Sequence, residues 1–149
     1  MKPQILIVIS LLLITGCTAN FYVTPDDLIK QVAENQKKSD RMVMLPVVVP
    51  TVSIFFASRY DANNIRKVLC KNKNGELVYL YPDQNTQLEI TSKSTKELVK
   101  MYFDTVFFEG TKLTGLRSRL LPGMTRQIEL TDIEKIELYG EFPKTEIVH

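Results

Sequence analysis

The chain has 149 residues, with 19 lysines and arginines against 17 aspartates and glutamates, a formal net charge of +2. A balance this close to neutral predicts no bulk electrostatic attraction to nucleic acid or to a membrane surface. The only histidine is His149, so Ser/His or Cys/His nucleophilic catalysis is excluded unless the last residue takes part. The spacing of His and Cys fits no metal site, and no glycine-rich phosphate loop is present.

The beginning of the chain combines a positive charge, a short apolar run and a cysteine. Lys2 precedes residues 5–14, which are apolar with one exception. This run has the length of the hydrophobic region of a secretory signal peptide, whereas a helix that crosses a bilayer needs about 20 apolar residues. The run ends in Ile14-Thr15-Gly16-Cys17, which resembles the lipobox of bacterial lipoproteins.

The resemblance implies a lipid anchor. In that family the cysteine thiol receives diacylglycerol, the chain is cut just before it, and the new amine is acylated. Residues 1–16 are then a signal peptide and Cys17 is the lipid attachment site, with the covalent acyl chains as the only cofactor. By the enterobacterial sorting pattern, Thr18 in place of an aspartate favours the outer membrane, facing the periplasm. The alternative is an ordinary cysteine at the end of a membrane anchor or of a buried amino-terminal helix.

Removal of residues 1–16 leaves 133 residues, enough for one domain, 17–149. We divide this domain into a lipidated tether (17–24), a helix (25–41) and a β domain (42–149). An extended tether of this length reaches about 25 Å, so the domain is expected to stay close to the membrane.

The helix prediction rests on its first turn. Thr24 is a good N-cap, Pro25 suits the first helical position, and two aspartates follow where the helix dipole favours acids. An amphipathic face is predicted for Leu28, Ile29, Val32 and Ala33. We expect this face to pack on the domain rather than to bind a membrane surface or a partner.

The most apolar stretch of the mature chain runs from Met42 to Phe56, 15 residues without a charge. Pro46 and Pro50 break a helix and confine a strand to an edge or an entry segment. We therefore predict an extended segment that leads into a buried strand near residues 52–56. The alternative is an exposed apolar patch for a partner.

The rest of the chain has a β pattern. Asn74-Gly75 lies between two β-prone runs and predicts a hairpin, and Leu88 and Ile90 share one face of the next strand. A long strand is predicted after Tyr102, followed by a turn at Glu109-Gly110 and a strand over 112–121 with a bulge or bend at Gly115. One helical turn at 131–135 precedes the last strand, and residues 141–149 are expected to be a loose end.

The predicted fold class is mainly β (α+β): an amino-terminal amphipathic helix followed by a small antiparallel β-barrel or a strongly bent sheet. Over residues 65–140 this pattern resembles small SH3-like and Sm-like barrels, through short bent strands and a helical turn before the last strand. If Cys17 is a thioether, Cys70 is the only remaining thiol and no intrachain disulfide can form. We interpret Cys70 as a core residue rather than a reactive thiol.

One charge pattern suggests a binding site. Lys112 and three arginines lie between Gly110 and Ile128 without an acid, and six acids against two lysines follow up to Glu146. Neighbouring strands with these charges would simply neutralise each other. The alternative is that Arg117, Arg119 and Arg126 converge beside the turn at residues 122–123 on an anionic partner, Arg117 and Arg119 sharing one strand face.

These patterns predict a membrane-anchored bacterial envelope lipoprotein that acts as a non-enzymatic binding or structural component. An envelope protein is the expected partner, besides the membrane that holds the lipid anchor. The alternatives are an envelope hydrolase that uses two carboxylates and a small-ligand carrier with an empty barrel interior.

Overall fold

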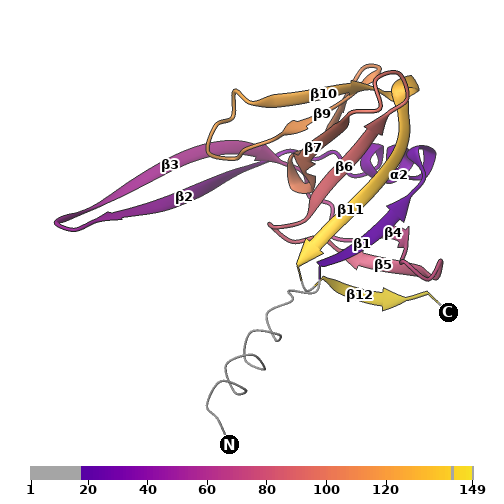
Figure 1. Ribbon diagram of the computed structural model, residues 1–149, viewed down its shortest axis with the longest axis horizontal. Coiled ribbons are helices and arrows are strands. Elements are labelled where there is room, and N and C mark those ends of the chain that lie inside the picture. Colours follow the sequence, from indigo (N-terminus) through magenta and orange to yellow (C-terminus); the bar gives the residue numbers. More distant parts are fainter. Residues whose placement is uncertain (1–17, 142, 149) are drawn as a thin grey trace, which may run out of the picture.

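The computed structural model describes residues 18–141 and 143–148, so the predicted signal peptide, Cys17 and His149 lie outside the described residues. Within these ranges the chain is mainly β, and its strands form three antiparallel sheets of seven, three and two strands (Figure 1). This confirms the mainly β, antiparallel class.

The seven-stranded sheet has the order β12-β5-β4-β1-β11-β6-β7. Its strands, in chain order, are β1 (Thr18–Val23), β4 (Val68–Lys71), β5 (Leu77–Tyr81), β6 (Gln87–Ser92), β7 (Leu98–Tyr102), β11 (Ile133–Glu141) and β12 (Lys144–Ile147). The sheet stays open, with β12 and β7 at its edges, so the alternative of a closed barrel is wrong for the described chain. The carboxyl-terminal segment is also not a loose end, because β12 pairs with β5.

The strand β1 lies in the middle of this sheet. It pairs with β11 from Thr18↔Glu141 to Val23↔Ile136, and it meets β4 through the pair Tyr22↔Lys71. The prediction that residues 18–23 belong to a free tether is therefore wrong. Phe21 and Val23 are buried in the core, so the apolar residues of this segment are the reason that it joins the sheet.

A single helix of more than one turn, α2 (Pro25–Ala33), follows β1 in the described chain. The Thr24 side chain accepts a hydrogen bond from the Asp27 backbone N–H, as expected for the N-cap, and Leu28 and Val32 are buried. The helix ends well before residue 41. The apolar face stops at Val32, and the next positions on that face, Gln36 and Asp40, are polar, so a longer helix would bury nothing more.

The three-stranded sheet has the order β10-β9-β8, from β8 (Phe107–Glu109), β9 (Lys112–Leu116) and β10 (Thr125–Glu129). Two single 3-10 turns connect it to the large sheet: η1 (Phe103–Thr105) after β7 and η2 (Leu130–Asp132) before β11. The turn η1 interrupts the long strand predicted after Tyr102, and η2 lies at the predicted helical turn. A Cβ at Gly115 would lie 2.5 Å from the Met101 sulfur, so this glycine allows β9 to approach β7 closely.

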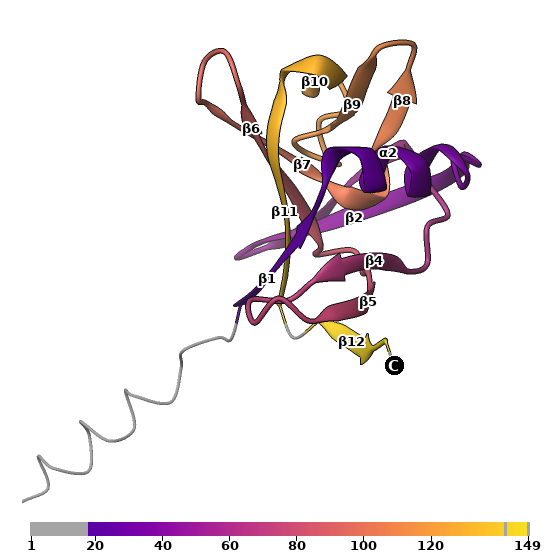
Figure 2. The ribbon, with the colours of Figure 1, turned by 90° about the vertical axis from the view of Figure 1, so that its right-hand side faces the viewer.

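The hydrophobic core lies where the large sheet, α2 and the small sheet meet (Figure 2). The hairpin predicted around Gly75 is confirmed as β4–β5, and Gly75 has a positive φ of 82°. Leu88 and Ile90 are both fully buried, as predicted. Other core side chains with almost no exposure are Leu28, Val32, Val68, Leu80, Met101, Phe103, Leu113, Ile136 and Leu138.

Candidate functional site

A long β-hairpin projects from the domain. It consists of β2 (Ser39–Val49) and β3 (Val52–Ala62), which pair only with each other, from Ser39↔Ala62 to Val49↔Val52. We call this two-stranded sheet the arm; Figure 1 shows it extending far beyond the rest of the domain. Eleven residues per strand give it a length of about 36 Å.

The outer part of the arm, residues 44–57, is apolar on both faces; we call it the apolar tip. Its only polar side chains are Thr51 and Ser53. On one face the pairs are Met44↔Ala57, Pro46↔Phe55 and Val48↔Ser53, and on the other Leu45↔Phe56, Val47↔Ile54 and Val49↔Val52. Val48 is 77% exposed, and the other exposed large apolar residues of the tip are Met44, Leu45, Val49, Val52, Ile54, Phe55 and Phe56.

The prediction of a buried strand near residues 52–56 is therefore wrong, because all five of these residues are exposed. The apolar composition predicted burial, but no other described element packs on either face of the arm at this point. The exposed patch that the sequence left as the alternative is what the structure contains.

Charged side chains surround the foot of the arm. Arg59 Nη1 lies 3.4 Å from Asp40 Oδ2, and Lys38 Nζ lies 3.3 Å from Asp61 Oδ2, all four side chains being largely exposed. Beyond them, residues 42–58 carry no charge. The arm thus has a sharp boundary between a charged foot and an apolar outer part.

A buried ion-pair cluster holds the foot to the domain. Asp104 in η1 is 6% exposed, and its Oδ1 accepts hydrogen bonds from Arg119 Nε and Nη2 at 3.2 and 2.8 Å. Its Oδ2 accepts a hydrogen bond from the Tyr60 hydroxyl at 3.1 Å and lies 3.6 Å from Arg41 Nη1. Burial and the negative charge of Asp104 raise the pKa of Tyr60. Because Tyr60 and Arg41 are opposite each other in the arm, this cluster fixes the direction in which the arm points.

Arg119 is therefore not part of a surface site. Its side chain is 11% exposed, its Cζ lies 3.9 Å from the centre of the Tyr102 ring, and it also donates to the Gln84 carbonyl. The prediction that Arg117 and Arg119 share a strand face is wrong because β9 ends at Leu116. The sequence could not reveal this partner, since Asp104 is 15 residues away and on a different element.

The other two arginines do come together. Arg117 and Arg126 line one surface hollow with Lys100 and Glu97, beside β7. Two of the three predicted residues thus lie side by side, without Arg119. The neutralisation expected from the acidic run is limited in this sheet to Lys112 and Glu129, whose charged atoms lie 3.5 Å apart across β9 and β10.

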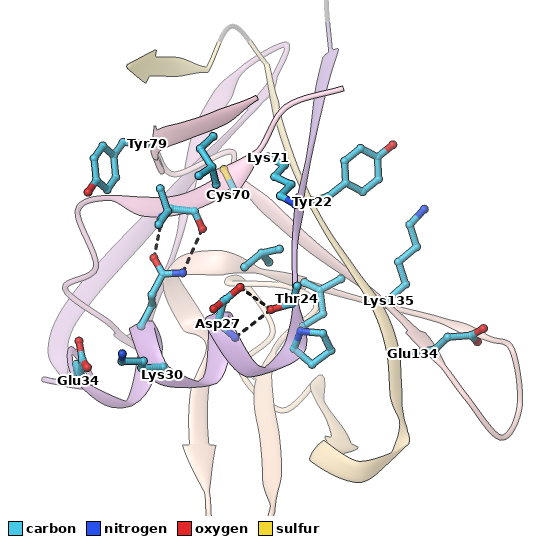
Figure 3. Close-up of a pocket in the computed structure, with 16 residues that line it drawn as sticks. Tyr22, Thr24, Asp27, Lys30, Glu34, Cys70, Lys71, Tyr79, Glu134 and Lys135 are labelled. Carbon is cyan, nitrogen blue, oxygen red and sulfur yellow. Dashed lines mark hydrogen bonds between the residues drawn. The ribbon is translucent and has the colours of Figure 1, made fainter. Parts of the chain in front are cut away.

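A groove of about 560 Å³ lies between α2 and the strands β1, β4, β5 and β11 (Figure 3). It forms because β1 and β4 separate beyond their single pair, Tyr22↔Lys71. The Gln31 side chain takes the place of the missing strand partner: its Nε2 donates to the Leu69 carbonyl at 3.1 Å, and its Oε1 accepts from the Leu69 N–H at 2.7 Å. Charges of both signs line the groove, from Asp27, Lys30, Glu34, Lys71, Glu134 and Lys135.

Cys70 also borders this groove and is 3% exposed. Burial raises the pKa of its thiol to about 11, so the reactive thiolate is scarce at neutral pH. This agrees with the predicted role as a core residue.

Replacement of Gln31 by alanine is expected to lower the free energy of unfolding by about 1–3 kcal/mol, because it leaves the half-buried Leu69 N–H and C=O without partners. Urea denaturation of the purified protein measures the change. The exposed neighbour Lys30 provides the control, since Lys30→Ala should change stability by less than about 0.5 kcal/mol. Equal stabilities of the two variants would contradict the bridging role of Gln31.

Within residues 18–141 and 143–148, no group of three or more His, Cys, Asp or Glu side chains is placed to hold a metal ion. None of the helices in these ranges has the length and apolar composition needed to cross a membrane. Comparisons with protein-family models, curated proteins and solved structures give no significant match.

Proposed function

We propose that the protein is a lipid-anchored component of the bacterial envelope that acts by binding, not by catalysis, and that the arm is its binding surface. The observation that carries this proposal is the exposure of the apolar tip on both faces. Burial of apolar surface contributes about 25 cal/mol per Å², so a cluster of eight exposed large side chains gains stability when a partner covers it. Contiguous exposed patches of this kind mark interaction sites.

The lipid anchor of the proposal rests on the lipobox-like sequence that ends at Cys17. It agrees with the position of β1, which begins at Thr18. Acyl chains on Cys17 would hold the domain directly at the bilayer surface, since the next residue already belongs to the sheet. We place the protein at the outer membrane, facing the periplasm, on the sorting argument from Thr18.

A small-ligand carrier is the second candidate, and the groove beside α2 is the observation that favours it. The groove lies between a helix and four strands of an open sheet, not inside a barrel as the sequence predicted for a carrier. For the hydrolase alternative, the most buried carboxylate of the described chain is Asp104. Its oxygens are already held by two arginines and a tyrosine.

Replacement of Cys17 by serine tests the anchor. The variant is expected to lose acyl labelling, because the thiol that carries diacylglycerol is gone. Cys70→Ser is the matched control, since it removes the other cysteine and leaves the lipobox intact; it should stay in the membrane and keep its label. A wild-type protein without acyl label, or a Cys17→Ser protein that keeps the label, would show that no lipid is attached to Cys17.

A further inference from the structure

We propose that the apolar tip of the arm inserts into the hydrocarbon region of a lipid bilayer, which makes the arm a second membrane contact. The inference names the partner of the arm and so rests on its proposed binding role, but it does not depend on acylation of Cys17. The boundary between the charged foot and the apolar tip, together with the absence of a polar face on the tip, carries the argument.

The distribution of apolar side chains favours lipid over a protein partner. An arm that docks on one protein surface needs one apolar face, and its other face stays in water and is polar. Here Phe55 and Phe56, neighbours on β3, point to opposite faces, and they are 64% and 56% exposed. Lipid chains surround an inserted segment on all sides, so they cover both faces at once.

The foot of the arm has the charge that lipid headgroups favour. Over residues 37–61 the charged side chains are Lys37, Lys38, Arg41 and Arg59 against Asp40 and Asp61, an excess of two positive charges. In the buried cluster, the negative charge of Asp104 and the positive charge of Arg119 cancel, so they do not change this excess. Anionic phosphates at a bilayer surface therefore meet a net positive foot when the tip enters the hydrocarbon, and each basic residue near such a surface adds attraction.

The length of the tip sets the depth of insertion. Six residue pairs from Met44↔Ala57 to Val49↔Val52 extend about 20 Å, whereas one leaflet of hydrocarbon is about 15 Å thick. The outer edges of β2 and β3 carry unpaired backbone groups that hydrocarbon cannot satisfy. The arm therefore enters at a tilt, so that only the pairs next to the turn lie in the hydrocarbon and the edges nearer the foot stay close to interfacial water. Pro46 removes one such N–H, since an N–H at that position would face the outer edge of β2.

The absence of tryptophan from the chain makes insertion directly measurable. Val48→Trp places a single tryptophan at the most exposed large apolar side chain of the tip, and Leu98→Trp places one on β7, where the native side chain is 55% exposed. Both full-length variants are mixed with vesicles of phosphatidylethanolamine and phosphatidylglycerol, with and without bromine on the acyl chains. Val48→Trp is expected to shift its emission to shorter wavelength and to lose most of its intensity in brominated vesicles, and Leu98→Trp to do neither.

Three further measurements distinguish insertion into lipid from its alternatives. Addition of Ile54→Asp to Val48→Trp should abolish the quenching, because it puts a charge in the tip, while circular dichroism should show that the sheet is retained. The quenching of Val48→Trp should persist in a Cys17→Ser background, because insertion of the tip does not need acyl chains; its loss there would overturn the inference. Equal or absent quenching at both tryptophans overturns the inference, and a blue shift without vesicles together with a dimer in sedimentation assigns the tip to a second copy instead. Acyl labelling of Cys17 reports separately on the proposed lipid anchor.

Discussion

Replacement of Asp104 by alanine is expected to lower the free energy of unfolding by about 3–5 kcal/mol, the usual result of removing one partner of a buried ion pair. The variant leaves the Arg119 guanidinium 11% exposed without its carboxylate, and it also removes the acceptor of the Tyr60 hydroxyl. Equilibrium denaturation by urea or heat measures the loss. Since Arg41 and Tyr60 belong to the arm, hydrogen exchange at the foot of the arm should also accelerate.

Asp40→Ala is the matched control for Asp104→Ala. Asp40 also pairs with an arginine, Arg59, but both side chains are more than half exposed, so the change should be under about 1 kcal/mol. The double variant Asp104→Leu/Arg119→Leu should be more stable than Asp104→Ala, because it removes the unpaired charge as well. A loss for Asp104→Ala no larger than that for Asp40→Ala would mean that the cluster does not hold the foot of the arm.

Asn63→Ala should destabilise the protein by about 3 kcal/mol, since it removes a hydrogen-bond partner from each of three buried backbone groups. The Asn63 side chain is 2% exposed; its Nδ2 donates to the carbonyls of Phe103 and Val106, and its Oδ1 accepts from the Ile65 N–H. It thereby connects the segment after β3 to the turn η1. Thermal unfolding followed by circular dichroism gives the change in stability.

The adjacent residue serves as the comparison for this second variant. Asn64 is exposed, and its amide donates to the Lys37 carbonyl at the surface. Asn64→Ala should cost less than about 1 kcal/mol, because water replaces the lost hydrogen bond. If both asparagines proved equally tolerant of alanine, the buried amide could not be what connects the arm to η1.

Features that depend on neighbouring residues could be predicted from the sequence. The Thr24 cap needs only the residues of the first helical turn, and the β4–β5 hairpin needs only the backbone freedom of Gly75 between two apolar runs. The common face of Leu88 and Ile90 follows from the twofold period of a strand. Each of these predictions is confirmed.

Features that depend on distant partners could not be predicted. Arg119 has the same local sequence context as a surface arginine, and only Asp104 and Tyr102 make it a buried one. Asn63 and Asn64 are likewise indistinguishable in the sequence. For the arm the prediction was wrong in the opposite direction: an exposed segment was predicted to be buried. Its composition is that of a core strand, and only the whole fold shows that no other described element covers it.

The pairing of β1 with β11 determines when this fold can form. Residues 18–23 occupy the centre of the large sheet, yet their main partner is residues 136–141, more than a hundred positions later. A chain that emerges amino terminus first holds its central strand without that partner until residues 136–141 have been released. Closing so long a loop is slow, so the centre of the large sheet stays open until residues 136–141 are available. An unfolded chain is the form that a narrow protein-conducting channel accepts. Under the export that we propose, the sheet would close on the far side, once both of its central strands have arrived.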